Sequence, residues 1–124
     1  MDANGAYMTV YDTHRKRNLY ADISAEDLAE LRKYRCEAGG PNCIGIGTQR
    51  HHGMIRRGKS AKWLNVLINY QLVCYVCHTE TGYADSAENH IAFYNLQSDR
   101  YGEDVVESWI DSLPYRISPD VQRG

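Results

Sequence analysis

Apolar residues recur at helical spacing in three stretches of the 124-residue chain, and each stretch predicts a helix. The first helix is predicted to begin near Ser24 and to run to Cys36. Ser24 and Asp27 resemble a capping box, in which a hydroxyl and a carboxylate satisfy free backbone N–H groups at the helix start. The apolar stripe of this helix consists of Leu28, Leu31 and Tyr34.

Two further helices are predicted in the second half of the chain. One begins at Asp85, which resembles a capping box with Glu88, and its core-facing residues are predicted to be Ile91, Tyr94 and Leu96. The other begins near Glu103, since acidic residues in a first turn suit the helix dipole. Its apolar face consists of Val106, Trp109, Ile110 and Leu113, and Pro114 ends it.

Between the first two helices the pattern changes. Ile44, Ile46 and Thr48 alternate with other residues and predict a short strand that leads to His51. Residues 53–62 read as a basic loop. The apolar segment from Trp63 to Val73 has no clear period, so a strand and a short helix both stay open.

These elements predict one domain of the α+β class, with an N-terminal arm (residues 1–23), a core (24–114) and a tail (115–124). The arm contains a short strand predicted at residues 7–11. The chain has neither an apolar run long enough to span a membrane nor a signal-like start, which predicts a cytoplasmic protein and no membrane partner.

Charge is unevenly distributed, although the net charge is only −2. Residues 50–62 hold five basic and no acidic residues, whereas residues 78–124 hold nine acidic and three basic ones. The basic segment is suited to binding phosphates even in a slightly acidic protein. A solvated loop followed by an acidic tail is the alternative interpretation.

The four cysteines fall into two close pairs, Cys36-x6-Cys43 and Cys74-x2-Cys77. Disulfides are rare in the cytoplasm, and two such pairs can meet around one tetrahedral Zn²⁺. We therefore predict a structural zinc site, with four unrelated buried thiols as the alternative. Because four cysteines leave no open coordination position, this zinc would hold the fold together and do no chemistry. It would also bring the segment before His51 close to His78.

The order of the cysteine pairs, the two histidines and an asparagine along the chain resembles that of the HNH endonucleases of the ββα-metal group, in particular small phage-type members. The residues that carry this resemblance lie in the runs RCEAGGPNCIGIGTQRHHG and NYQLVCYVCH. The resemblance covers about residues 35–78. It implies a zinc-stapled ββα-metal core with additional flanking helices, and hydrolysis of phosphodiester bonds in DNA. Neighbouring residues on a strand point to opposite faces, so His51 and His52 need a break in the strand, such as Gly53, to serve one site.

The resemblance also implies roles for individual residues. His52 matches the general base that activates water, a task suited to an imidazole near neutral pH. His51 and His78 match the ligands of a catalytic divalent metal, either Mg²⁺, Mn²⁺ or Ni²⁺, with Zn²⁺ also compatible with imidazole ligands. Asn69 matches the residue that holds the loop and orients the catalytic histidine. The predicted contacts with DNA phosphates are Arg50, Arg56, Arg57 and Lys59.

The sequence departs from the family pattern at Gly82, where many relatives carry a further histidine. Glu80 and His90 are candidate substitutes, and Asn65 competes with Asn69 for the asparagine role. A catalytically weak or inactive HNH-fold protein that regulates through DNA or protein contacts is therefore a second hypothesis. A zinc-binding interaction domain without a nucleic-acid role is a third.

Overall fold

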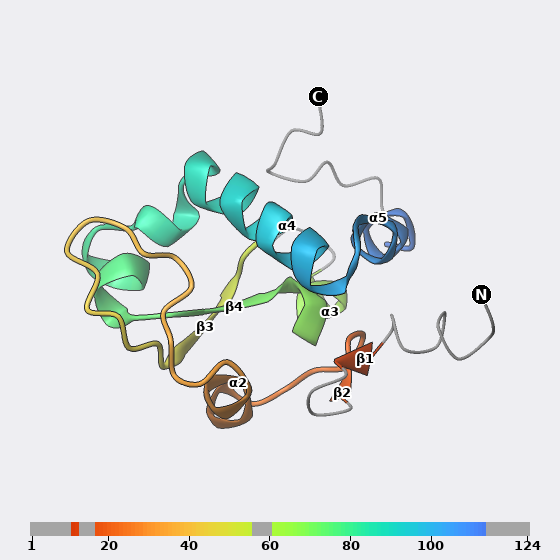
Figure 1. The fold of residues 1–124 in the computed structure, drawn as a ribbon, viewed down its shortest axis with the longest axis horizontal. Helices are drawn as coiled ribbons and strands as arrows, with labels where there is room; N and C mark the ends of the chain where they lie inside the picture. Colours follow the sequence, from red (N-terminus) through yellow and green to blue (C-terminus); the bar gives the residue numbers. More distant parts are fainter. Residues whose placement is uncertain (1–10, 13–16, 56–60, 114–124) are drawn as a thin grey trace.

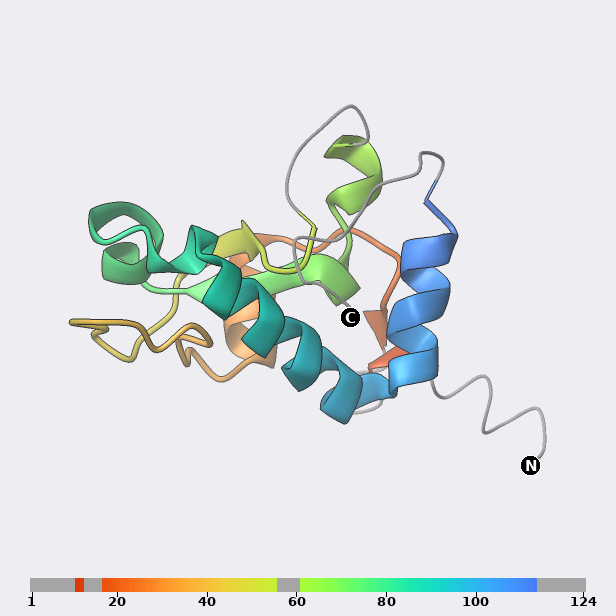
Figure 2. The ribbon, with the colours of Figure 1, turned by 90° about the horizontal axis from the view of Figure 1, so that it is seen from above.

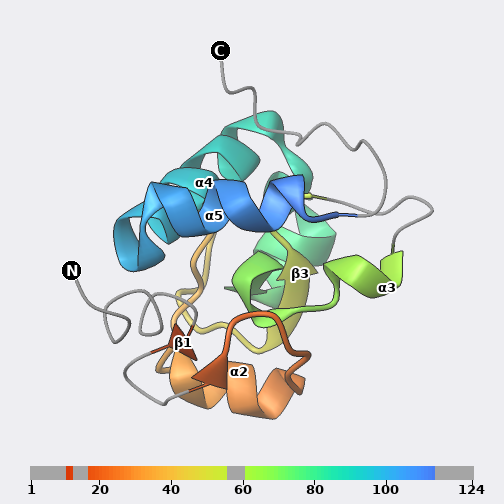
Figure 3. The same ribbon diagram turned by 90° about the vertical axis from the view of Figure 1, so that its right-hand side faces the viewer.

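The computed structural model describes residues 11–12, 17–55 and 61–113, and its fold is α+β, as predicted. Strands β3 (Gln49–His52) and β4 (Tyr70–Val73) form an antiparallel sheet. It lies between helix α2 (Ala25–Leu31) and helix α4 (Ala87–Tyr101), as Figures 1 and 3 show. A second antiparallel pair consists of β1 (Tyr11–Asp12) and β2 (Arg17–Asn18).

Helix α2 begins where the sequence predicts. The hydroxyl of Ser24 accepts a hydrogen bond from the backbone N–H of Asp27 at 3.0 Å and so caps the helix. The helix ends at Leu31 and does not reach Cys36, because Lys33 and Tyr34 have left-handed backbone angles (φ 59° and 57°). Tyr34 is 54% exposed, so its predicted place in the apolar stripe is wrong.

The predicted strand over residues 44–48 is also wrong. Ile46 forms one isolated bridge with Arg35, and the continuous strand begins only at Gln49. Ile44 and Ile46 are about 60% exposed because this segment turns around the cysteines, with Gly45 at φ 85°. The alternation of Ile44 and Ile46 with glycines therefore does not correspond to the buried face of a strand.

The segment from Trp63 to Val73 has no single period because it contains three short elements. Helix α3 (Ala61–Leu64) is followed by a 3-10 helix (Leu67–Asn69) and then by β4. All four residues of β4 are buried, since other parts of the chain cover both of its faces.

Helix α4 begins one residue later than predicted, with Ser86 as its cap. The Ser86 hydroxyl accepts a hydrogen bond from the Asn89 backbone N–H at 3.1 Å. Ile91 is 43% exposed, and the predicted core-facing role is wrong for this residue, whereas Tyr94 and Leu96 pack at the edge of the core. The buried face is mostly polar and consists of Asn89, His90, Phe93 and Gln97.

Helix α5 (Glu103–Asp111) follows the prediction and packs against α4, which it crosses at a steep angle (Figure 2). It buries Val106, Trp109 and Ile110, and Leu113 packs against the same core. Leu19 and Ile23, from the predicted arm, are also buried in this core. Within the described ranges, no helix is both long and apolar enough to cross a membrane.

Gly53 is the point where the end of β3 touches α4. A Cβ atom at this position would lie 2.7 Å from Cε2 of Phe93 and 2.9 Å from Cβ of Gln71. Both distances are too short for carbon atoms, so only glycine fits between the strand and the helix without displacement of its neighbours.

The Gly53→Ala substitution should therefore destabilise the protein by about 1–3 kcal/mol through overpacking. Chemical denaturation of the single and double variants tests this. In a Phe93→Leu background the added methyl group should cost less, by at least about 0.5 kcal/mol. If the free-energy losses of the two substitutions are strictly additive, contact with Phe93 is not the reason that Gly53→Ala destabilises the protein.

Candidate functional site

The four cysteines lie together, close enough to bind a structural metal such as zinc. Their sulfur atoms are all within 4.8 Å of one another. Cys36, Cys74 and Cys77 are buried, and Cys43 is half-buried. Backbone N–H groups donate to three of the sulfurs: Cys74 to Cys36 at 3.2 Å, Cys77 to Cys74 at 3.4 Å, and Gly45 to Cys43 at 3.3 Å. These N–H groups stabilise negative charge on the sulfur atoms. Four thiolates are soft ligands, so the site suits a soft cation such as Zn²⁺.

Glu37 explains why the two cysteine pairs meet. Its backbone N–H donates to the Leu72 carbonyl at 2.8 Å, and its side-chain Oε1 accepts from the Leu72 N–H at 2.9 Å. These bonds hold the segment containing Cys36 against β4, just before Cys74. The loop then turns back at Asn42, where φ is 61°, and carries Cys43 to the same place.

The thiols differ in acidity. Burial raises the pKa of Cys77 to about 12 and also raises that of Cys43. Burial acts in the same direction on Cys74, but hydrogen bonds from the backbone of Cys77 and Ile44 outweigh it and lower the pKa of Cys74 to about 6. Cys74 therefore loses its proton more readily than Cys43 and Cys77, and a bound cation would favour the thiolate form of all its ligands.

His51, His52 and His78 line a cleft with a volume of about 370 Å³. Strand β3 carries His51 and His52, and a short π-helical segment (Val76–Glu80) carries His78. The ring centroids of His51 and His78 are 5.4 Å apart. The cleft is lined by Asp22, Arg50, His51, His52, Asn65, Tyr70, His78 and Asp85.

His51 points into the buried side of the cleft. Its Nε2 lies 2.8 Å from the Ala84 carbonyl oxygen and 3.7 Å from a carboxylate oxygen of Asp85. Burial lowers the pKa of His51 to about 4, although the Asp85 charge acts in the opposite direction. The imidazole is therefore neutral at neutral pH, the form in which histidine binds a metal.

His52 faces Asn65 and Tyr70. Its Nε2 lies 2.7 Å from Oδ1 of Asn65, and its ring stacks on Tyr70 with centroids 5.8 Å apart. Because an amide oxygen only accepts, this bond holds the proton on Nε2 and leaves Nδ1 as the basic nitrogen. Both histidines line the same cleft, although they are neighbours on one strand.

Asn69 is fully buried, and all its hydrogen bonds go to the backbone. Its Oδ1 accepts from the N–H groups of Met54 (3.1 Å) and Ile55 (3.0 Å), and its Nδ2 donates to the carbonyls of Ile55 (3.0 Å) and Leu64 (3.2 Å). It thus holds the loop after β3. The other expected task, orienting His52, is carried out by Asn65.

The second predicted metal ligand, His78, has its own partner. Its Nδ1 lies 2.7 Å from Oε1 of Gln49, at the start of β3. Since the amide oxygen accepts, Nδ1 carries the proton and Nε2 keeps the lone pair that a metal would need. No spacing pattern in the sequence marks Gln49 as this partner.

Arg50 is the predicted phosphate contact that the structure describes, whereas Arg56, Arg57 and Lys59 lie outside the described residues. Its guanidinium lies 3.4 Å from the Asp22 carboxylate and donates to the Ile23 carbonyl at 2.8 Å. The Tyr70 hydroxyl donates to the same carboxylate at 2.9 Å. Burial and that bond raise the pKa of Tyr70 to about 12, so the hydroxyl stays protonated.

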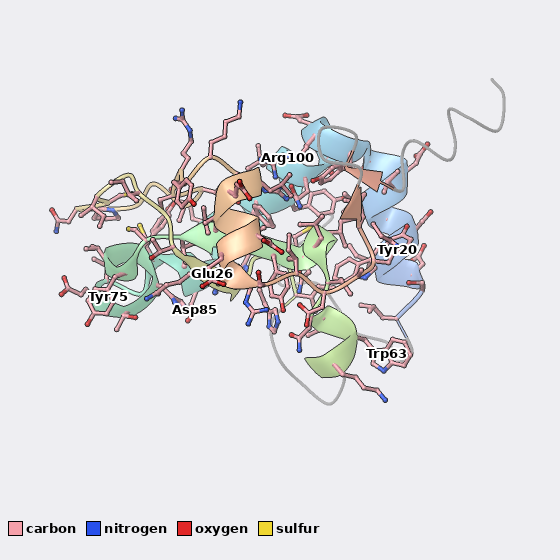
Figure 4. The ribbon with its side chains drawn as sticks, turned by 90° about the horizontal axis from the view of Figure 1, so that it is seen from below. Tyr20, Glu26, Trp63, Tyr75, Asp85 and Arg100 are labelled. Atoms are coloured by element: carbon pink, nitrogen blue, oxygen red, sulfur yellow. The ribbon has the colours of Figure 1, made fainter. Side chains whose placement is uncertain are left out.

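Gly82 has a left-handed backbone (φ 70°) and caps a 3-10 helix (Tyr83–Asp85). That turn places Asp85 at the cleft. The sequence does not indicate this position, because its pattern predicts Asp85 to be a helix cap. In Figure 4, Asp85 lies towards the end of the molecule that carries Tyr75, and Trp63 lies at the other end.

Comparisons with known protein families, with curated proteins and with solved structures found no match for this chain.

Removal of one cysteine should abolish metal retention at the sulfur cluster. After dialysis against a weak chelator, wild type should hold about one zinc per chain and Cys74→Ser much less, because structural zinc needs all four ligands. Tyr75→Ser, an exposed neighbour changed to the same residue, is the matched control. Equal zinc in Cys74→Ser and the control would contradict a four-cysteine site.

Replacement of Asn69 should destabilise the protein, because Asn69→Ala leaves two buried N–H groups and two carbonyls without their partner. We expect a loss of about 2–4 kcal/mol in urea denaturation with saturating zinc. Asn95→Ala, on an exposed turn of α4, should change stability by less than about 0.5 kcal/mol. Similar losses in both variants would contradict the loop-holding role.

Proposed function

We propose that the chain is a metal-dependent endonuclease of the HNH type that hydrolyses phosphodiester bonds in DNA. The observation that carries this proposal is the meeting of His51, His52 and His78 in one cleft. Each of them comes with a partner that fixes its ring or its proton. Histidines held in this way are suited to metal binding and proton transfer.

The arrangement of the backbone supports the same proposal. The antiparallel strands β3 and β4 are followed directly by a helical segment that carries Cys77 and His78, the order expected for a ββα-metal core. A zinc ion at the four cysteines would fix the distance between this segment and β3. That zinc would be structural, since the cysteines fill its tetrahedral coordination.

In the proposed reaction His52 is the general base. Its Nδ1 takes a proton from a water molecule while the water oxygen forms a bond to phosphorus and the bond to the leaving oxygen breaks. Asn65 is a positioning residue, because its bond to Nε2 holds the tautomer that leaves Nδ1 basic. A divalent metal held by His51 and His78 would supply positive charge for the phosphate and the leaving oxygen.

Arg50 is suited to holding a phosphate at the same cleft. Its side chain is 39% exposed, and it stacks over the Tyr70 ring at 5.1 Å, which limits its movement. A contact of this kind positions the DNA backbone but does not read the base sequence.

One observation favours a second function, that of an HNH-fold binding protein without strong catalysis. Arg50 lies beside Asp22, and Asp85 lies at the same cleft, so among the described residues that line it two carboxylates face one guanidinium. Such a cleft repels phosphate unless a cation is bound, and it suits a basic protein partner.

A plasmid-cleavage assay tests the proposed function. Zinc-loaded wild type should nick or linearise supercoiled DNA with Mg²⁺, Mn²⁺ or Ni²⁺. His52→Ala should lose about 10²–10⁴-fold in rate, the usual contribution of a general base. Asn95→Ala, at an exposed residue that does not line the cleft, should cleave like wild type.

Absence of cleavage by wild type with all three metals would refute the proposal, and so would equal cleavage by His52→Ala and wild type. Retention of DNA on a native gel without cleavage would favour the regulatory binding protein. Absence of DNA binding at low salt would favour an interaction domain with no nucleic-acid role.

A further inference from the structure

A second group of metal-ligating side chains shares His51 with the cleft. It consists of His51 on β3, Asp85 at the end of the 3-10 helix and His90 in the first turn of α4. One ligand atom from each lies within 4.8 Å of those of the other two. Asp85 and His90 lie outside the segment that resembles the HNH family.

These distances are close to those of a metal site. Nitrogen and oxygen ligands bind transition metals at about 2.0–2.2 Å, which places neighbouring ligand atoms about 3–4 Å apart. The carboxylate oxygen of Asp85 is already 3.7 Å from Nε2 of His51. Without an ion, this Nε2 donates to the Ala84 carbonyl oxygen, so binding a metal there requires the His51 proton to move to Nδ1. The Ala84 carbonyl would keep its hydrogen bond from Asn89 Nδ2 at 2.8 Å.

His90 has the environment of a ligand. The residue is fully buried, and its Nδ1 lies against the Gly53 carbonyl oxygen, which can only accept. This contact fixes the proton on Nδ1 and leaves the lone pair on Nε2, the arrangement typical of metal-binding histidines. The ring lies 5.7 Å from that of His51, so the two imidazoles are neighbours.

Asp85 supplies a different kind of ligand. Its side chain is about half exposed and lines the cleft, so it lies between the buried histidines and the solvent. Its negative charge would offset part of the charge of a divalent ion. An open side at this position leaves room for water or a phosphate oxygen to complete the coordination.

We propose that His51, Asp85 and His90 together hold one divalent transition-metal ion at the edge of the cleft. The inference rests on the proposed function, because the ion is the one that the reaction requires; His51 remains a ligand, and Asp85 and His90 take the place of His78. It goes further in giving Asp85 and His90, in place of a ligand at Gly82, the task of completing the site. His78 lies beside this group, 5.4 Å from His51 between ring centroids.

The ligand chemistry indicates the class of metal. Two imidazoles and one carboxylate suit Mn²⁺, Fe²⁺, Co²⁺, Ni²⁺ or Zn²⁺, whereas Mg²⁺ prefers oxygen ligands only. The site should therefore bind Mn²⁺ more tightly than Mg²⁺.

Binding of Mn²⁺ to the zinc-loaded full chain tests the inference without any measurement of activity. Mn²⁺ is the probe because thiolates bind it poorly, so the cysteine cluster does not compete. The free ion is followed by its electron paramagnetic resonance signal during titration. Wild type should bind one Mn²⁺ per chain at this site, and a tenfold excess of Mg²⁺ should leave most of it bound.

Two variants remove ligands, and one is a control. Asp85→Asn keeps the size of an exposed side chain and should not disturb folding, and His90→Gln removes the buried imidazole. Each should weaken Mn²⁺ binding by at least about tenfold, the smallest loss usually seen for changes around a metal site. Asp99→Asn, an exposed carboxylate on α4, should bind Mn²⁺ like wild type.

Unchanged Mn²⁺ affinity in Asp85→Asn would overturn the inference, even if His90→Gln failed to fold. The outcome is independent of the cleavage assay. If the variants lose Mn²⁺ but wild type cleaves no DNA, the metal site stands and the nuclease proposal fails. If wild type cleaves DNA and both variants bind Mn²⁺ normally, the nuclease proposal stands and these ligands are wrong.

Discussion

The antiparallel pairing of β3 with β4 is the interaction on which both candidate sites depend. It sets His51 opposite Gln71 and His52 opposite Tyr70. It also places the start of β3 beside the end of β4, where Cys74 follows. This sheet has only two strands, and a two-stranded sheet is at best marginally stable in isolation. The pairing therefore relies on the helices that cover it and on the cysteine cluster at its end.

Buried polar contacts fix how those helices lie on the sheet. The amides of Gln71 and Asn89 bind each other in both directions, at 3.0 and 2.8 Å, and connect β4 to α4. Gln97 donates to the Ile68 carbonyl at 2.8 Å further along the same helix. A buried amide that loses its partner costs about 1–3 kcal/mol, so these contacts oppose any rotation of α4. That fixed orientation is what brings His90 next to His51.

The local chemistry of the sequence predicts part of this structure. A serine cap, an amphipathic α5 and two cysteine pairs each depend on residues close together in the chain, and each lies where expected. The buried face of α4 is not predictable from apolar periodicity, because it consists mostly of polar side chains whose hydrogen-bond partners lie on other elements. Asn65 and Asn69 compete for one role in the sequence, whereas in the structure Asn69 holds the loop after β3 and Asn65 contacts His52. Asp85 could not be recognised as a cleft residue, since only the turn at Gly82 aims it there.

The position of His51 and His52 as neighbours on one strand has a consequence for how such a protein can change. Side chains alternate along a strand, so a one-residue deletion in β3 before His51 would shift both imidazoles by one position along the sheet. His52 would then lie where His51 lies now, next to His90 and Asp85, and no histidine would remain beside Asn65. A change in the length of this strand would therefore remove one of the two histidine environments even if both histidines were kept.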